Sequence, residues 1–349
     1  MNNKKVELLS PAGNLEKLKI AIKYGADAVY AGVSHFSLRI RAGKEFTFET
    51  FKEGIDYAHA RGKKVYATIN GFPFNSQIEL LKKHIATMAA LEPDGFIVAA
   101  PGVVKLCREI APQIDIHLST QANVLNYLDA QVFWDMGVKR IVVAREISLK
   151  DVIEIKKHLP DMEIEIFVHG SMCFAYSGRC LVSAVQMGRV PNRGSCANDC
   201  RFEYTLYAAN EDHSTLFRLE EEPGVGTYIF NSKDMNLASH IKEILDSGAV
   251  DSLKIEGRTK SPYYAAVTAK AYRNAIDDYY DGKFEASKYQ RELYTTKNRG
   301  FTDAYLIHRP FEKTDSQNHE YALSKGSYEV AGLVTEDEEH FLCKYKVYP

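Results

Sequence analysis

The sequence lacks long apolar runs, and this absence limits where the protein resides. The start, Met-Asn-Asn-Lys-Lys-Val-Glu-Leu-Leu-Ser, has lysines, but Glu7 and Ser10 interrupt the run of roughly 7–15 apolar residues that a secretory signal needs. No later stretch approaches the roughly 18 uncharged apolar residues of a membrane span. We therefore expect a cytoplasmic protein that makes no membrane contact.

An excess of charge of one sign is also missing. The chain has 44 Lys and Arg against 46 Asp and Glu, a formal net charge of -2. A protein coated in basic charge for binding duplex DNA is thereby disfavoured, and an RNA contact would have to come from a local patch. With 45% hydrophobic and 26% charged residues, the composition is that of an ordinary globular protein.

Several catalytic motifs are absent too. No Gly-x-Gly-x-x-Gly follows the first predicted strand, which disfavours a dinucleotide-binding fold. Neither His-Glu-x-x-His nor Gly-x-Ser-x-Gly occurs, so the residue sets of zinc peptidases and serine hydrolases are missing. A cysteine peptidase could pair Cys173 with His169, but these residues could equally share a cofactor shell. No residue set for hydrolysis by a known mechanism is therefore evident.

Short apolar segments alternate with segments of helical period. Most of the segments are apolar throughout, as in parallel strands covered on both faces. The 349 residues fit one barrel of roughly 250 residues plus appendages. We therefore predict an α/β fold, a (βα)8 TIM-type barrel over residues 1–283, with an open doubly wound sheet as the alternative. The eight expected strands span residues 6–9, 28–31, 64–69, 95–99, 114–119, 140–144, 163–169 and 252–256.

Two segments fall outside this regular pattern. Residues 170–236 follow the seventh strand and far exceed the roughly 2–6 residues of a usual strand-to-helix loop, and such long loops tend to be functional. Within this insertion we predict a hairpin of residues 202–208 and 227–231 around an acidic loop at 220–222. Residues 284–349 are predicted to be a C-terminal arm and an incomplete small β module, with strands at 328–335 and 341–347.

Four of the six cysteines lie in the insertion, at Cys173, Cys180, Cys196 and Cys200. Thiolates are soft ligands, and four of them suit either zinc or an iron-sulfur cluster. Structural zinc usually has two pairs of closely spaced cysteines. Here only Cys196 and Cys200 are close, because six residues separate Cys173 from Cys180. The spacing favours a cluster, with zinc and with reactive or buried thiols as alternatives. Cys107 and Cys343 are expected to be inert.

Arginines and aromatic residues surround these cysteines. The guanidinium group of arginine binds phosphate through paired hydrogen bonds, and unstacked RNA bases stack on aromatic rings. The alternatives are solvated loop charges and core aromatics, or a site for a small dicarboxylate. The predicted substrate-binding residues are Arg39, Arg41, Arg145, Tyr176, Arg179, Arg193 and Arg201.

Polar residues are expected at the C-terminal ends of the strands, where barrel enzymes place their chemistry. Lys254 and Glu256 alternate toward one side of the last strand, and the plain alternative is an inward ion pair that braces the barrel. The predicted catalytic residues are His169, Lys233, Asp234, Glu256 and Arg258. Other polar strand-end residues are Asn14, Tyr30, Asn70, Ser119, Gln121, Glu146 and Lys254.

The run from Glu165 to Ser183, which contains Cys173 and Cys180, resembles the defining motif of the collagenase-like peptidases, peptidase family U32. Residues 7–13, 26–30, 254–258 and 298–301 resemble the same family, so the similarity spans about residues 6–310. Some members were labelled proteases, whereas others act in hydroxylation of the tRNA wobble uridine, of a ribosomal RNA cytidine, or in ubiquinone synthesis. Residues 176–180 and 196–202 most resemble the tRNA 5-hydroxyuridine branch.

This resemblance implies that the four cysteines hold a 4Fe-4S cluster and that prephenate serves as an oxygen donor. We therefore expect an iron-sulfur dependent RNA hydroxylation enzyme that acts on tRNA and forms 5-hydroxyuridine at the wobble position. The alternatives are a metal-dependent collagenase-like peptidase and a zinc-stabilised RNA-binding scaffold without catalysis of its own. The sequence predicts neither a protein partner nor an oligomeric state.

Overall fold

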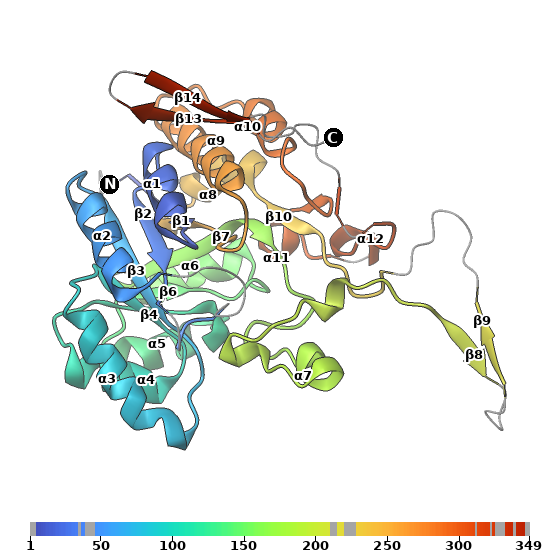
Figure 1. Ribbon diagram of the computed structural model, residues 1–349, viewed down its shortest axis with the longest axis horizontal. Helices are drawn as coiled ribbons and strands as arrows, with labels where there is room; N and C mark the ends of the chain where they lie inside the picture. Colours follow the sequence, from blue (N-terminus) through green and yellow to red (C-terminus); the bar gives the residue numbers. More distant parts are fainter. Residues whose placement is uncertain are drawn as a thin grey trace.

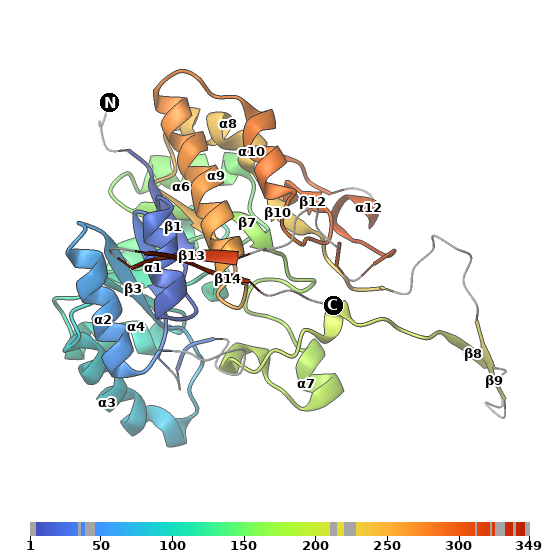
Figure 2. The same ribbon diagram turned by 45° about the horizontal axis from the view of Figure 1, so that its top comes forward.

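The structure, a computed structural model, describes residues 5–33, 36–38, 46–209, 215–219, 228–310, 313–321, 323–324, 332–337 and 340–345. Its centre is a closed barrel of eight parallel strands, ordered β11-β1-β2-β3-β4-β5-β6-β7, and closed by pairing of β11 with β7 (Figures 1 and 2). This confirms the TIM-type barrel. The strands are β1 (Glu7–Pro11), β2 (Ala28–Ala31), β3 (Lys64–Ile69), β4 (Gly95–Val98), β5 (Ile116–Leu118), β6 (Arg140–Val142), β7 (Glu163–Ser171) and β11 (Ser252–Ile255).

Helices surround the barrel and cover the outer face of its strands (Figure 1). Several begin at side chains that cap backbone N–H groups, such as Asn14, Asn126, Ser148 and Ser261. A large apolar core lies between strands and helices and includes Leu8, Val29, Ile55, Phe96 and Leu118. The helices are α1 (Leu15–Lys23), α2 (Phe48–His59), α3 (Ile78–Ala89), α4 (Pro101–Ile110), α5 (Tyr127–Asp135), α6 (Leu149–His158), α8 (Ile241–Asp246) and α9 (Pro262–Tyr280).

The barrel interior holds an ionic network beside a small apolar cluster of Leu9, Ala28, Tyr30, Tyr66 and Ile97. The Arg140 guanidinium contacts Glu7 at 2.5 Å, Glu163 at 2.7 Å and Glu165 at 3.0 Å. Lys254 Nζ lies 2.7 Å from Glu165 Oε1. Burial alone would raise the pKa of Glu165, but Lys254 and Arg140 outweigh burial and hold it below its usual value. Lys254 is therefore the inward brace that the sequence left as an alternative.

The insertion contains α7 (Val182–Met187), the short strands β8 (Tyr207–Ala209) and β9 (Leu216–Arg218), and β10 (Asp234–Asn236). β8 and β9 form an antiparallel arm that projects away from the barrel (Figures 1 and 2). The predicted hairpin is therefore wrong in its second strand. Pairing with the nearer segment closes a shorter loop, which costs less chain entropy. The predicted acidic loop at 220–222 lies outside the described residues.

The remaining elements extend the sheet and end in a separate hairpin. β12 (Phe301–Thr302) pairs with β10, which pairs antiparallel with the end of β7. Helices α10 (Ala286–Leu293), α11 (Ala304–Ile307) and α12 (Lys313–Ser316) lie along this segment. β13 (Gly332–Asp337) and β14 (His340–Tyr345) pair antiparallel, close to the two strands predicted for the C-terminal module. In the described ranges, no helix is both long and apolar enough to span a bilayer.

The Arg140→Met substitution is expected to lower the free energy of unfolding by roughly 3–5 kcal/mol, because it leaves carboxylates in the barrel interior without their shared cation. Arg108→Met on the exposed face of α4 is the matched control, with a change within roughly 0.5 kcal/mol. Chemical denaturation of both variants measures the difference. Equal stability of the two variants would contradict a structural role for the network.

Stability is expected to fall in mild acid because of buried histidine. Burial lowers the pKa of His169 to about 3, so the folded chain resists a proton that the unfolded chain binds below its ordinary pKa of 6.5. The contribution of neutral His169 to the free energy of unfolding is fully present above pH 6.5. It falls by roughly 1.4 kcal/mol per pH unit as the pH is lowered toward 3. The free energy of unfolding is measured by chemical denaturation at pH 6.5 and at pH 5.5. Its decrease between these pH values should be smaller for His169→Gln than for the exposed control His158→Gln. An unchanged slope in His169→Gln would refute this assignment.

Candidate functional site

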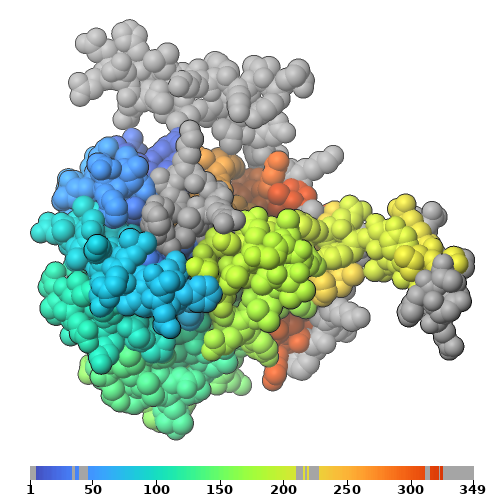
Figure 3. Space-filling view, turned by 60° about the horizontal axis from the view of Figure 1, so that its bottom comes forward, coloured from blue at the N-terminus to red at the C-terminus, as the bar shows by residue number. Residues whose placement is uncertain are grey.

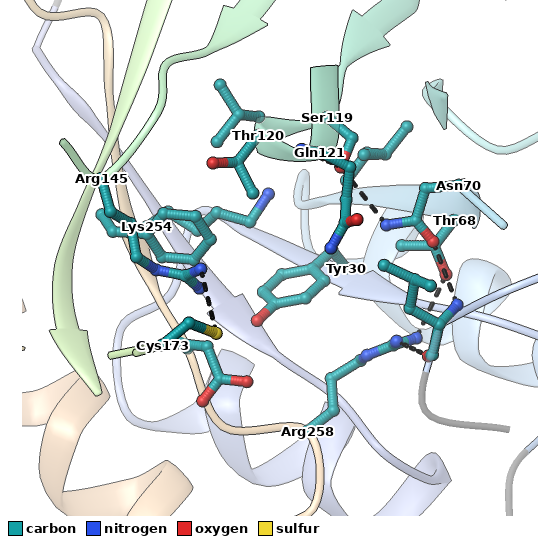
Figure 4. Close-up of a pocket in the computed structure, with 15 residues that line it drawn as sticks. Tyr30, Thr68, Asn70, Ser119, Thr120, Gln121, Arg145, Cys173, Lys254 and Arg258 are labelled. Atoms are coloured by element: carbon teal, nitrogen blue, oxygen red, sulfur yellow. Dashed lines mark hydrogen bonds between the residues drawn. The ribbon is translucent and has the colours of Figure 1, made fainter. Parts of the chain in front are cut away.

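A cavity of about 100 Å³ opens at the C-terminal end of the barrel strands (Figure 4). A water molecule needs roughly 10–15 Å³ on this scale, so the cavity has room for a ligand of several heavy atoms. The lining comes from strand ends, from the loops after them and from the insertion. The lining residues are Tyr30, Leu38, Thr68, Asn70, Ile97, Ser119, Thr120, Gln121, Val142, Arg145, Phe167, Cys173, Lys254, Glu256 and Arg258.

Three cations contribute to the cavity wall, in different environments. Arg258 donates to Ser37 Oγ at 2.8 Å and to Thr68 Oγ1 at 3.1 Å. Lys254 lies 4.5 Å from the centre of the Tyr30 ring, and burial lowers its pKa. Arg145 stacks on Phe167 with its guanidinium carbon 4.2 Å from the ring centre, and it forms no ion pair with any described carboxylate. Arg145 is therefore the cation best placed to meet an anionic ligand.

The insertion is fastened to the barrel mouth at three loops, which follow β3, β5 and β6. Glu146 Oε1 accepts a hydrogen bond from Ser177 N at 2.8 Å. The adjacent Gly178 packs so closely that an added Cβ would lie 2.1 Å from the carbonyl oxygen of Gln121. On the other side, Phe72 N donates to Asn192 O at 3.1 Å, so the insertion lies against the segment after β3 (Figure 3). These contacts hold the cysteine-bearing segment over one side of the cavity.

The four cysteines of the insertion are reduced, and their thiols influence one another. Cys173 is exposed, and the others are half-buried. Burial raises the pKa of the Cys180 and Cys200 thiols, and the charges of neighbouring cysteines add to both shifts. Cys173 also lines the cavity, with its sulfur 4.0 Å from Arg145 Nη1.

The spacing of these thiols bears on which metal they suit. A tetrahedral zinc site needs four sulfurs within roughly 4 Å of one another. Among the described side chains, no three His, Cys, Asp or Glu residues are grouped as ligands of one metal ion. Four soft thiolates are chemically suited to an iron-sulfur cluster, in which each thiolate binds a different iron, or to zinc.

The predicted catalytic residues separate into two groups. Glu256 and Arg258 line the cavity, whereas His169, Lys233 and Asp234 do not. His169 is buried, and its Nδ1 lies 3.4 Å from Tyr272 Oη. Asp234, the first residue of β10, forms an ion pair with Arg299. The backbone N–H of Lys233 donates a hydrogen bond to Ser316 O. β10 is not a barrel strand but pairs antiparallel with the end of β7, which places its residues beside the mouth.

The predicted substrate-binding residues have different environments. Tyr176 and Arg179 are exposed on the insertion, and Arg145 lines the cavity. Arg201 Nη2 lies 3.5 Å from Met172 O. Arg193 stacks on Phe74 at 4.1 Å and donates to Gln77 Oε1, so it also fastens the insertion. Arg39 and Arg41 lie outside the described residues.

Among the cavity residues that sequence reasoning missed are Thr68, Thr120 and Phe167. Side chains two apart on a strand face the same side. Tyr66 on β3 and Glu165 on β7 both belong to the barrel interior. Thr68 and Phe167 lie two residues after them on the same strands, so they face the same side. The alternation would therefore have found two of them. Thr120 lies in a short helical turn after β5, for which no such pattern exists.

Comparison with known proteins gives similarity along most of the chain. The profile of the family described as Peptidase family U32 matches residues 13–316. A Helicobacter pylori protein named tRNA hydroxylation protein P is 70% identical over 340 residues, 97% of this chain and 81% of that protein. An Escherichia coli protein of the same name is 41% identical over 357 residues, 92% of this chain and 78% of that protein. A Porphyromonas gingivalis collagenase is 31% identical over 320 residues, 88% of this chain and 75% of that protein.

Gly178→Ala is expected to loosen the insertion, because the new methyl group would collide with the Gln121 backbone. Gly188→Ala is the matched control. Gly188 has a φ of +63°, similar to the +74° of Gly178, but no described atom lies within 4 Å of a Cβ added at Gly188. Both variants carry the left-handed backbone penalty of roughly 1–2 kcal/mol. Limited proteolysis of residues 170–209 should accelerate several-fold only in Gly178→Ala. Equal cleavage of both variants would contradict the docking.

Proposed function

The chain belongs to peptidase family U32, and we propose that it hydroxylates a base of RNA with the help of an iron-sulfur cluster. Two relatives carry the name tRNA hydroxylation protein P, so we take tRNA as the substrate and 5-hydroxyuridine at the wobble position as the product. The observation that supports this most is the position of Cys173, which belongs to the group of four thiols and to the wall of the cavity. A cofactor held there would border on a bound base.

Cys173, Cys180, Cys196 and Cys200 would hold the cluster. When bound, it would supply electron transfer or Lewis acidity at the edge of the cavity. Zinc is the weaker alternative, because structural zinc usually has two closely spaced cysteine pairs and six residues separate Cys173 from Cys180. Ser183 Oγ and Asn198 Oδ1 lie 4.0 Å and 3.9 Å from Cys196 Sγ, and such polar neighbours tune sulfur ligands.

Hydroxylation replaces a C–H bond of the base by C–OH and oxidises the base by two electrons. The oxygen donor must be reduced by the same two electrons, so that R–OH and base–H become R–H and base–OH. We propose a small hydroxy dicarboxylate such as prephenate as this donor. Arginine binds carboxylates through paired hydrogen bonds, and Arg145 and Arg258 both line the cavity. Arg145, which lacks a carboxylate partner among the described residues, would bind the donor.

The other predicted residues take supporting parts in this proposal. Glu256 is the carboxylate of the cavity wall and the candidate for moving a proton there. His169, Lys233 and Asp234 would act through neighbours, because none of them lines the cavity. Tyr176 and Arg179 present an exposed ring and an exposed cation on the insertion, which suit a base and a phosphate of RNA outside the cavity. A tRNA substrate places this activity in the cytoplasm.

A peptidase function has less support. The collagenase relative is 31% identical, against 70% and 41% for the two relatives named for tRNA hydroxylation. His169 is buried against Tyr272, and no hydrogen bond joins it to Cys173 in the described part of the chain. The cysteine and histidine of a peptidase pair would have to be within hydrogen-bond reach.

Cysteine substitutions test the proposal directly. Protein purified without oxygen is expected to be brown, and each of Cys173→Ser, Cys180→Ser, Cys196→Ser and Cys200→Ser is expected to lose most of its iron. In a bacterial strain without its own tRNA hydroxylation proteins, the wild type should restore 5-hydroxyuridine and the four variants should reduce it to background. Cys107→Ala, at a buried position in α4, is the control that retains iron and product.

Three results would overturn the proposal in distinct ways. A colourless wild-type protein that contains zinc would remove the cluster. Normal 5-hydroxyuridine in tRNA after deletion of the gene from its own host would remove the tRNA assignment. Full proteolysis of a collagen-like peptide by all four cysteine variants would favour a peptidase that needs no cluster.

A further inference from the structure

Gln121 is a cavity residue with an unsatisfied side chain. It lies in a short turn (Thr120–Ala122) after β5, and its side chain points into the cavity toward Tyr30 (Figure 4). Its Oε1 atom is buried and accepts no hydrogen bond from any residue that the structure describes. Its side-chain amide also donates none to a described residue. A buried acceptor of this kind is normally satisfied by a protein group, a water or a ligand.

The backbone of Gln121 is held firmly, so its side chain has a fixed origin. Ser119 Oγ accepts from Gln121 N at 3.4 Å, and Asn123 closes the turn with φ 58°. On the opposite side, Gly178 packs against the Gln121 carbonyl, which couples this residue to the cysteine-bearing insertion. The amide is therefore presented to the cavity by two elements that meet at this point.

The surroundings of the amide fit a flat, neutral ligand. Tyr30 and Phe167 line the cavity with aromatic rings. The Tyr30 hydroxyl already donates to Ile255 O at 3.0 Å, so this residue offers its ring rather than its hydroxyl. Arg145 and Arg258 serve anions, but an amide presents one acceptor and one donor side by side. That pair matches a ligand whose own N–H and C=O are adjacent.

We propose that Gln121 reads the Watson–Crick edge of a uracil base that has left its stack and entered the cavity. Uracil N3–H would donate to Gln121 Oε1, and the amide NH₂ would donate to an adjacent uracil carbonyl. Enzymes that modify a base commonly extrude it and read this edge by hydrogen bonds between aromatic side chains. This inference rests on the proposed function and adds a residue that holds the edge of the base.

Two substitutions at Gln121 separate recognition from stability. Gln121→Leu removes both hydrogen bonds at similar volume. Gln121→Glu keeps the shape but presents only acceptors, so one oxygen still accepts from uracil N3–H while the other opposes the uracil carbonyl that the amide NH₂ served. Both changes leave the backbone contacts of Gln121 with Ser119 and Gly178 intact. Gln131→Leu, on α5, where Gln131 donates to Asp135 on the exposed surface, is the matched control.

The test uses the full chain with its cofactor, a carboxylate oxygen donor, and two RNA stem-loops that differ only by uridine or cytidine at the target position. Gln121→Leu should lower kcat/KM for the uridine RNA by roughly 10- to 100-fold, the discrimination of one good bidentate pair, with no change in KM for the donor. Gln121→Glu should lower kcat/KM for the uridine RNA by a similar factor, because one of its oxygens opposes a uracil carbonyl. Gln131→Leu should match the wild type.

The outcomes distinguish this inference from the function beneath it. A wild-type protein that hydroxylates neither RNA rejects the proposed function, and the base-reading role with it. An active wild type whose Gln121→Leu and Gln121→Glu variants keep the wild-type kcat/KM for the uridine RNA rejects the role of Gln121 alone. A Gln121→Leu variant that raises KM for the donor and leaves the RNA parameters unchanged also rejects it, because the amide would then bind the carboxylate.

Discussion

The shared carboxylate of Glu165 is the contact on which the barrel and its cavity both depend. It is fully buried on β7 and bonds Arg140 of β6 and Lys254 of β11, so it ties together the strands on either side of it. β7 and β11 are also the pair that closes the barrel. Buried charges tolerate the loss of one partner poorly, because the remaining charge has no water to replace it. The network therefore restricts how these strands align.

The same network forms the floor of the candidate site. Lys254 donates a hydrogen bond to Glu165, and its Nζ also contacts the ring of Tyr30. The Tyr30 hydroxyl donates to Ile255 O. The position of Tyr30 thus follows from an ion pair deeper in the barrel. Above this floor, β7 continues to Ser171, where β10 pairs with it antiparallel, and the chain then turns into the insertion. Cys173 is therefore placed by a strand that the ionic network has already fixed.

Much of the barrel was predictable from the sequence, because strands buried on both faces appear as local apolar segments. β2 and β3 match their predicted ranges. β10 was not predicted, since Asp-Met-Asn has no strand pattern and pairs only because the end of β7 offers an edge. The partners of Arg140 were also missed, because its three carboxylates lie on other strands or on the far side of the barrel.

The candidate site was predictable as a set of strand ends but not as a geometry. Glu256, Arg258 and Arg145 line the cavity as strand-end reasoning predicts, whereas Lys233 and Asp234 lie beside it on β10. Arg193 was predicted to bind substrate from its residue type, and only the structure revealed its contacts with Phe74 and Gln77. A long insertion can dock in many ways, and the pattern of its cysteines does not encode the position of the loops that receive it.

The arrangement of charge by depth suits the proposed function, in which one barrel mouth binds RNA and a small acid. A nucleic-acid backbone is drawn to cations at the surface, where Arg179 and the exposed ring of Tyr176 lie on the insertion. A base is neutral and carries an N–H beside a C=O, and an amide with an unsatisfied acceptor can pair with both groups. Gln121 and Arg145 lie on the same cavity wall but offer different chemistry. In the proposed function, contact with the base and binding of the acid are therefore assigned to different residues of one cavity wall.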